Sequence, residues 1–215
     1  MGETPHGQST RPGFDEAFRQ AYAIAGEKLR SSDPALVCRR SAAALVEENG
    51  RQSISLTYLG RECRVQLPDV IVSAVSGEPL SQRDTLLILH YLVTADGTSL
   101  TGKPVAFREL PEGGFYYPTF LKRCVKPLLD SFADRPEALV TAAGSIGGLK
   151  AETGDFSFRV LALPRVPVTV TLWLGDEELP PEGNILFDIT ITGYLATEDV
   201  TVLCEILVWK ISRSA

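Results

Sequence analysis

The sequence predicts an α+β fold: N-terminal helices and a β-hairpin, a central buried helix with a long loop, and a mainly antiparallel sheet with a C-terminal helix. Two patterns support this prediction. Apolar residues recur at spacings of three and four over 14–29, as on one face of a helix. They alternate with polar residues over 53–58, 62–67 and 156–174, as in half-buried strands.

We expect one domain over 14–215, preceded by a flexible tail over 1–13. The chain has 215 residues, enough to bury a core without help from disulfides or metals. The tail is polar and contains His6 but no apolar segment, so it is not a signal peptide. No stretch of the chain approaches the roughly 18 apolar residues of a membrane span. The sequence therefore predicts a cytoplasmic protein that does not bind membranes.

The first half of the chain contains the expected helix over 14–29 and then a second helix start. The pair Asp33-Pro34 combines a capping side chain with a proline that needs no N–H donor, which predicts a helix from Pro34 to about Glu47. The alternating runs 53–58 and 62–67 are joined by a three-residue turn, which predicts a β-hairpin.

The centre of the chain combines an apolar helix with a long segment of no clear period. Residues 79–81 open a leucine-rich helix that extends to about Ala95 and leaves few polar faces, so we expect it to be buried. The segment 96–119 is rich in glycine, proline and aromatic residues. Long aperiodic segments inside a domain are usually functional, and aromatic residues argue against disorder. We therefore expect an ordered binding loop.

The second half of the chain returns to helices and strands. Helices are expected over 120–132, where Pro127 marks a kink or a break, and over 135–143, which Gly144 ends. The expected strands and turn are 156–163, 167–174, the acidic turn 175–183 and 185–191. The final segment 198–211 has β-branched residues that suit a strand, but Thr197 as its N-cap favours a helix, which we expect.

The net charge of −6 comes from 27 acidic and 21 basic residues. Residues 166–215 hold eight acidic and two basic residues, so the whole excess lies in this last part of the chain. The composition excludes a disordered chain, and the absence of a basic stripe argues against nucleic acid as a partner.

The cysteines and histidines give no metal-ligand motif. Cys38, Cys63, Cys124 and Cys204 are far apart in the sequence, and no CxxC, HxxxH or HExxH pair occurs. We therefore expect buried thiols in a reducing compartment, no metal site and no iron–sulfur cluster.

Several residues are candidates for ligand binding, each with a structural alternative. His90, followed by Asp96 near the end of its helix, is either a proton donor or ligand facing a pocket or a core histidine with one hydrogen bond. Arg108 and Glu109, near Tyr116 and Tyr117, either clamp an anion beside stacking rings or hold the loop to the body of the protein. The remaining candidates are Asp188 and an acidic surface of Asp176, Glu177, Glu178 and Asp199.

The order of several short motifs resembles one prokaryotic domain family of unknown function, over about 60% of the chain. The motifs are Leu89-His90-Tyr91-Leu92, 95–98, 107–111, 115–116, 164–168, 173–178, 185–188 and 194–199. The resemblance implies one compact domain from an anaerobic bacterium or archaeon with a link to redox or cofactor-handling proteins, since some members carry an iron–sulfur module. Members have a histidine before the last Tyr-Leu pair, where this chain has Gly193, which argues against a two-histidine site with His90.

The function expected from the sequence is binding of a small molecule or cofactor by the His90 helix end, the 96–118 loop and the acidic 176–199 segment. The sequence does not identify the cofactor, and a tetrapyrrole, a corrinoid and a flavin are the classes to test. One alternative is an enzyme with Glu109 or Asp188 as acid/base and Arg108 as anion clamp. Another is an interaction module whose acidic end docks a basic redox protein.

Overall fold

The structure is a computed structural model that describes the chain from Pro12 to Ala215. Its helices are α1 (Pro12–Arg30), α2 (Pro34–Ser41), α3 (Gln82–Thr94), α4 (Gly113–Phe120), α5 (Lys126–Phe132), α6 (Glu137–Ala143) and α7 (Thr197–Ser212). Its strands are β1 (Ala44–Glu48), β2 (Arg51–Tyr58), β3 (Arg61–Gln66), β4 (Ile71–Ala74), β5 (Pro104–Ala106), β6 (Leu149–Lys150), β7 (Phe156–Leu163), β8 (Val166–Trp173) and β9 (Glu182–Asp188). The predicted α+β class is confirmed. His6 lies outside the described residues, as does all but the end of the expected tail.

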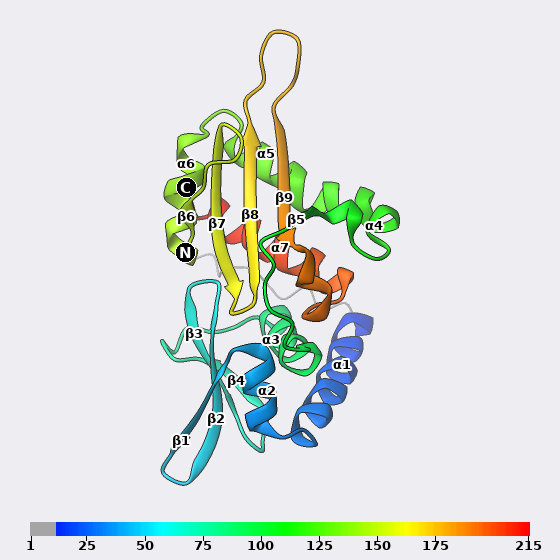
Figure 1. Ribbon diagram of the computed structural model, residues 1–215, viewed down its shortest axis with the longest axis vertical. Helices are drawn as coiled ribbons and strands as arrows, with labels where there is room; N and C mark the ends of the chain where they lie inside the picture. The colour runs from blue at the N-terminus through cyan, green and yellow to red at the C-terminus, as the bar shows by residue number, and fades with distance from the viewer. Residues whose placement is uncertain (1–11) are drawn as a thin grey trace, which may run out of the picture.

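The strands form two antiparallel sheets, one in each half of the molecule (Figure 1). The four-stranded sheet has the order β1-β2-β3-β4 and lies beside α1, α2 and α3. The five-stranded sheet has the order β5-β9-β8-β7-β6, and α5, α6 and α7 cover one of its faces. The turn after β8 extends well beyond both sheets as a thin loop.

The predicted helix over 34–47 is wrong in its second half. Asp33 caps α2 as expected, by accepting from the Ala35 N–H at 3.0 Å. The helix ends at Ser41 because Ala42 adopts the left-handed conformation, with φ of 53°. The chain then forms β1, whose Leu45 lies opposite Ile54 of β2, so strand pairing rather than the helix start at Asp33-Pro34 determines the structure beyond residue 43. The sequence pattern does not predict β1, β4 or β6, because each strand is short and largely exposed.

The predicted hairpin and central helix are confirmed. Strands β2 and β3 pair across the turn at Leu59 and Gly60. Ser81 caps α3 through a capping box, in which its hydroxyl accepts from the Asp84 N–H and the Asp84 carboxylate accepts from the Ser81 N–H. Leu87, Leu89 and Leu92 of α3 are buried, as expected, and Leu86 is half-buried.

The segment 96–119 is not one aperiodic loop. It contains β5, a 3₁₀ turn over 107–109 and α4, which begins at Gly113. A side chain at Gly113 would collide with the carbonyl oxygen of Phe107, so the start of α4 packs directly on the 3₁₀ turn. The Phe107 and Phe120 rings stack with centroids 4.0 Å apart. The aromatic residues therefore hold a helix in place, and the helix expected from residue 120 begins seven residues earlier. It passes through a π-helical turn over 121–125, so Pro127 lies in the first turn of α5.

The end of the chain differs from its prediction in two details. Strand β9 ends at Asp188, and the expected strand residues 189–191 belong to a 3₁₀ turn. The final segment is the helix α7, but Ala196 occupies the N-cap position rather than Thr197. The Thr197 hydroxyl instead donates to the Pro111 carbonyl at 2.7 Å and so links α7 to the start of α4.

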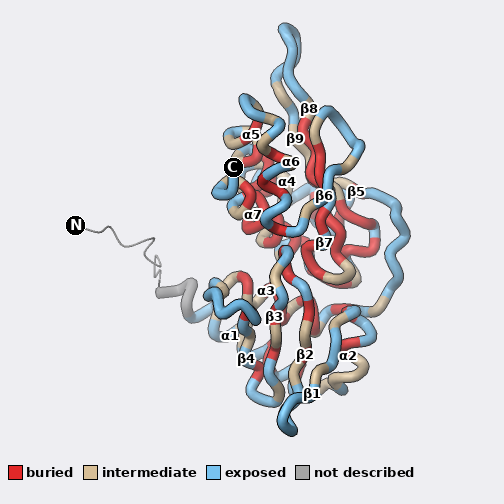
Figure 2. Tube along the Cα trace, turned by 90° about the vertical axis from the view of Figure 1, so that its left-hand side faces the viewer, coloured by how far each residue is buried: buried red, intermediate tan, exposed pale blue. Residues whose placement is uncertain are grey.

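The buried apolar side chains form one continuous cluster through both halves, densest around β7, β8 and α7 (Figure 2). Among the polar contacts that join the halves, two involve the backbone of β7 or of the turn that follows it. The Leu59 N–H donates to the Ala162 carbonyl at 2.9 Å, and the Tyr91 hydroxyl accepts from the Arg165 N–H at 3.1 Å. The turn between β2 and β3 is thereby fixed against the second sheet.

Candidate functional site

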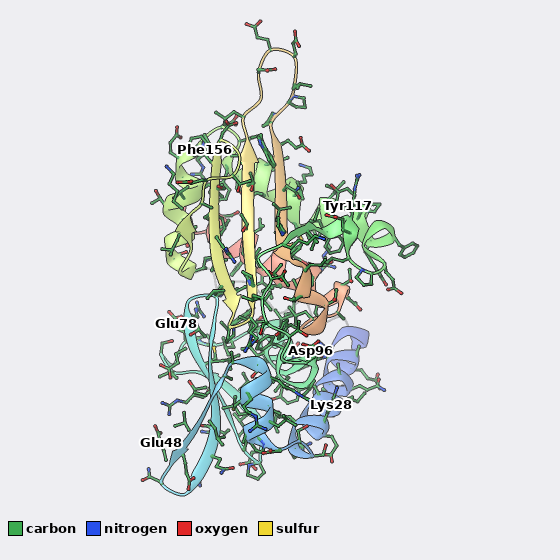
Figure 3. All side chains as sticks on the ribbon, in the orientation of Figure 1. Lys28, Glu48, Glu78, Asp96, Tyr117 and Phe156 are labelled. Atoms are coloured by element: carbon green, nitrogen blue, oxygen red, sulfur yellow. The ribbon has the colours of Figure 1, made fainter. Side chains whose placement is uncertain are left out.

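The residues that the sequence singled out do not gather around one pocket. Asp96 lies near the end of α3, whereas Tyr117 lies on α4 and well apart from it (Figure 3). The acidic turn 174–181 lies farther away still, at the end of the extended loop after β8. The expected pocket of helix end, loop and acidic segment is therefore split into separate local arrangements.

His90 forms a pair with Asp199 that joins α3 to α7. Its Nδ1 lies 2.9 and 3.0 Å from the two carboxylate oxygens of Asp199. A carboxylate bound to Nδ1 fixes the orientation of the ring. Nε2 is then the ring nitrogen that a further group would contact. Asp199 was expected to belong to an acidic surface, but its charge faces this imidazole.

One of the aromatic candidates, Tyr117, holds Arg108 to α4. The Arg108 guanidinium carbon lies 3.7 Å from the centroid of the Tyr117 ring, a cation–π contact. Glu109 accepts from the Ala106 N–H at 2.7 Å and closes the 3₁₀ turn. Tyr116 packs edge-on against Phe115 at 5.3 Å. These contacts fit the structural alternative, in which the side chains hold the segment to the body of the protein.

Asp188 anchors the segment 101–103 to the end of β9. Its buried carboxylate accepts hydrogen bonds from the Thr101, Gly102 and Thr190 N–H groups and from the hydroxyls of Thr101 and Thr190. Burial alone would raise the pKa of Asp188, but the bonds from Thr190, Gly102 and Thr101 lower it to about 2. The hollow beside it has a volume of about 90 Å³. Asp96 accepts locally, from the Thr98 N–H at 2.7 Å.

The acidic excess of the C-terminal segment does not form a single surface. The Asp176 carboxylate accepts from the N–H groups of Glu178 and Leu179, and these bonds lower its pKa. Glu177 and Glu178 are exposed beside it on the extended loop. Asp188, Asp199 and Glu205 each face their own donors elsewhere in the fold.

A groove beside the C-terminal half of α7 combines charge, an aromatic ring and free volume. Its volume is about 630 Å³, within the range of small-ligand pockets. Six charged side chains and one tryptophan line it: Arg61, Arg83, Asp84, Arg123, Glu205, Lys210 and Trp209. The four cations outnumber the two carboxylates, and Arg61 is paired with Glu78 at 3.0 Å, so the groove keeps a small excess of positive charge in a protein of net charge −6.

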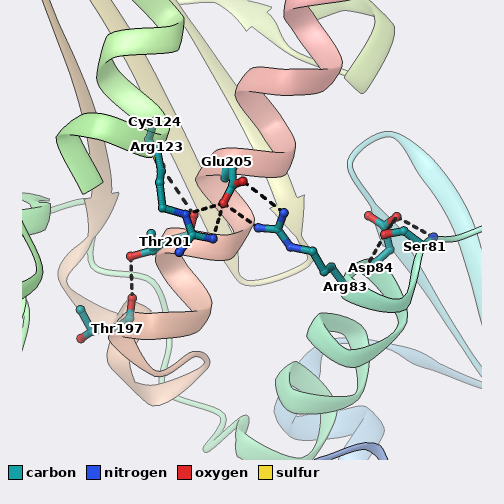
Figure 4. A network of polar contacts seen from close by, with 8 residues as sticks. All are labelled: Ser81, Arg83, Asp84, Arg123, Cys124, Thr197, Thr201 and Glu205. Carbon is teal, nitrogen blue, oxygen red and sulfur yellow. Dashed lines mark hydrogen bonds and ion pairs between the residues drawn. The ribbon is translucent and has the colours of Figure 1, made fainter. Parts of the chain in front are cut away.

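Glu205 lies between two guanidinium groups (Figure 4). Arg83 of α3 approaches it as a fork, with nitrogen–oxygen distances of 3.2 and 2.7 Å. Arg123, from the turn between α4 and α5, donates to the same carboxylate, with its Nε at 2.7 Å. Burial alone would raise the pKa of Glu205, but the two arginines lower it. This cluster therefore carries a net positive charge.

Lys210 adds an ammonium group without a carboxylate partner among the described residues. Burial lowers its pKa, as does the nearby Arg61, while Asp84 and Glu78 oppose the effect. The Asp84 carboxylate already accepts from Tyr58 and Ser81. Ser212 also lines the groove, and its hydroxyl oxygen is buried with no hydrogen-bond partner in the described chain. The groove therefore holds polar groups that the protein itself does not satisfy.

Trp209 is the exposed aromatic residue of this region. Its side chain is 55% exposed, and the Arg213 guanidinium lies 4.9 Å from its ring centroid. A second hollow of about 390 Å³ adjoins the groove and shares Arg61, Trp209 and Lys210 with it. Arg213 lines only this second hollow.

No local sequence pattern predicts the groove. Glu205 lies 82 positions from Arg123 and 122 from Arg83, so no local pattern connects them. One signal was available: Glu205 is the single carboxylate inside the apolar run 200–211. A charged residue at a mostly buried helix position needs a partner, which is a reason to search for cations elsewhere in the chain.

The described residues contain no grouping of three or more metal-ligating side chains. All four thiols are free and buried, as predicted, and burial raises the pKa of Cys63 to about 11 and that of Cys124 to about 12. None of the described helices is both long enough and apolar enough to cross a bilayer.

One family model matches nearly the whole of the described chain. Searches of curated proteins and of solved structures returned no match. The family model of a domain of unknown function, DUF3786, matches residues 33–210, from the start of α2 to near the end of α7. This range includes every charged residue of the groove. The chain therefore belongs to the DUF3786 family of domains of unknown function.

Proposed function

We propose that the protein binds a small anionic molecule in the groove beside α7. The observation that carries the proposal is the excess of cations there: Arg61, Arg83, Arg123 and Lys210 against Asp84, Glu205 and Glu78, which pairs with Arg61 at 3.0 Å. Cations held close together repel one another, and a bound anion would offset this repulsion.

The two arginines of the Glu205 cluster have donors to spare. A guanidinium has five N–H donors, and Glu205 takes two from each arginine. The remaining donors have no acceptor among the described residues, and both side chains are partly exposed. Arginine forks bind carboxylates and phosphates with two parallel bonds. The groove therefore offers an anion two forks, with Lys210 as an additional point charge.

The contacts of Asp188 and Glu109 give less support to the enzyme alternative. A general base works best with a pKa near the operating pH. The pKa of Asp188 is about 2, and five donors already occupy its carboxylate. Glu109 closes its own turn, and Arg108 lies on Tyr117.

A tetrapyrrole or corrinoid stays a prediction. The Nε2 atom of His90 is the nitrogen that would serve as an axial ligand, because Asp199 holds Nδ1. His90 does not line the groove or the second hollow beside Trp209, and it does not line the small hollow beside Asp188. Titration with haem and a corrinoid, followed by absorbance, tests this class, and unchanged spectra would remove it.

Tryptophan fluorescence gives a direct test of anion binding. The chain has two tryptophans, Trp173 on β8 and Trp209 in the groove, so Trp173→Phe leaves Trp209 as the sole reporter. Inorganic pyrophosphate at constant ionic strength should change the fluorescence of this variant with a saturable dependence. Adding Arg123→Gln or Lys210→Gln should weaken binding about fivefold to tenfold, since each removes a charged contact.

The matched control is Lys28→Gln, which removes a charge from an exposed position on α1 that lines neither hollow. Its affinity for pyrophosphate should equal that of the parent. Absence of saturable binding, or equal weakening in Lys28→Gln and Lys210→Gln, would refute the proposed site.

A further inference from the structure

We infer that the ligand is an elongated dianion with a flat apolar centre, bound across Trp209 with one acidic group in each of the two hollows. This inference rests on the proposed function and adds to it the ligand's shape and its second charge. It follows from how the charged and aromatic side chains are spaced along α7.

Glu205, Trp209 and Arg213 follow one another at intervals of four residues. Residues four apart lie on the same face of a helix, so these side chains form one row on α7 and the residue that follows it. At a rise of about 1.5 Å per residue, the row spans about 12 Å. The Arg83–Glu205–Arg123 cluster lies at one end, Arg213 at the other, and the indole between them.

The groove and the second hollow differ in the residues that line only one of them. The groove has the two guanidinium forks. The second hollow has Arg213, the hydroxyl-bearing Ser145 and the apolar Leu59 and Ile146. Lys210 and Arg61, which is paired with Glu78, line both, so cationic side chains continue from one hollow to the other. A ligand with a single acidic group would use only one end of this surface.

Trp209 determines what lies between the two acidic groups. Its ring is the shared wall of both hollows and is more than half exposed. Aromatic faces favour offset stacking with other flat rings. A molecule that crosses this wall therefore contacts an indole, and a flat apolar centre gains more from that contact than a flexible polar chain.

Three carboxylate probes test the inference by calorimetry. Biphenyl-4,4′-dicarboxylate has a flat centre with an acidic group at each end, biphenyl-4-carboxylate lacks one acidic group, and sebacate has both but a flexible chain. The rigid dianion should bind at least tenfold more tightly than either of the other probes. Biphenyl-4-carboxylate loses the second charged contact, and sebacate loses the stacking on Trp209.

The variant Arg213→Gln separates the second charge from the first. It should lower the affinity for biphenyl-4,4′-dicarboxylate to near that of biphenyl-4-carboxylate, whose own affinity should not change. The matched control is Arg39→Gln on α2, an exposed arginine that lines neither hollow.

The possible outcomes distinguish the two proposals. If biphenyl-4-carboxylate and the dianion bind equally, and Arg123→Gln weakens both, the groove binds anions but the inference about the second charge is wrong. If Arg213→Gln weakens the monoanion as much as the dianion, the two-ended arrangement is also wrong. If neither probe nor pyrophosphate binds, the proposed function itself fails.

Discussion

Asp188 and Glu205 are two carboxylates from the same acidic part of the chain, with opposite surroundings. Asp188 accepts only from neutral groups, namely backbone N–H groups and threonine hydroxyls. Glu205 accepts from two guanidinium groups. Around Asp188 the acceptor is saturated, whereas around Glu205 the donors outnumber the acceptor. The first arrangement holds a segment in place, and the second leaves capacity for another anion.

This difference shows why a perturbed carboxylate alone is a weak sign of a binding site. Both residues have a lowered pKa. The more strongly hydrogen-bonded one, Asp188, has the smaller neighbouring hollow, about 90 Å³ against about 630 Å³ beside Glu205. Unsatisfied donors and free volume separate the two environments, and the predictions below test that separation.

The largest expected effect is on stability, at Asp188. The change Asp188→Asn keeps the size of the side chain but replaces one accepting oxygen by a donor, which then faces either the N–H groups of Thr101 and Gly102 or that of Thr190. Unfolding in urea should show a loss of about 3 kcal/mol, because buried donors lose a charged acceptor. Asp176→Asn, on the exposed loop, is the control and should change the free energy of unfolding far less. Equal losses in both variants would contradict the anchoring role.

Stability should also depend on acid pH through the same residue. The folded-state pKa of Asp188, about 2, lies below the ordinary value of 3.8. Its stabilising contribution is therefore complete above about pH 4 and is lost as the pH falls toward 2. The difference in unfolding free energy between the wild type and Asp188→Asn should shrink over this range. A constant difference would show that ionisation of Asp188 does not stabilise the fold.

At Glu205, stability and affinity should change in opposite directions. Glu205→Gln leaves Arg83 and Arg123 facing each other without a negative charge, so the free energy of unfolding should fall by about 1 kcal/mol. The groove gains one unit of net positive charge, so pyrophosphate should bind at least threefold more tightly. Parallel urea unfolding and calorimetry measure both quantities. Weaker pyrophosphate binding would mean that Glu205 itself contributes to the ligand site.

The smallest expected effect is at Arg108. Arg108→Gln removes an exposed cation–π contact with Tyr117, for which about 0.5 kcal/mol of stability is expected. Pyrophosphate affinity should be unchanged, since Arg108 lines neither hollow beside Trp209. A loss of affinity as large as that in Lys210→Gln would favour the anion clamp expected from the sequence over the groove.

Most of the fold could be predicted because its signals are local. The cap at Ser81, the alternation in β2, β3, β7 and β8, and the charged ends of α7 are each visible within a few residues. The errors arose where a distant or unusual contact decided the outcome. Ala42 ends α2 in a left-handed conformation that its residue type does not suggest, and Gly113 starts α4 by packing on Phe107.

The candidate site could not be predicted, for the same physical reason. Its cations come from the turn at Arg61, from α3, from the π-helical turn and from the end of α7. Only the packing of α3 and α5 against α7 brings them together. The residues that the sequence favoured, such as Asp188 and Arg108, lie in segments rich in turn-forming or aromatic residues. In such segments, polar side chains often form hydrogen bonds with the nearby backbone instead of binding a ligand.

The hydrogen bond from Leu59 to Ala162 lies at the seam between the two sheets. The packing beside this bond is tight, because a β-carbon on Gly60 would lie 2.7 Å from the carbonyl carbon of Ile146. Arg61 reaches the second hollow from one side of this seam, and Ser145 and Trp209 reach it from the other. An occupant of that hollow would therefore contact residues from both halves of the molecule.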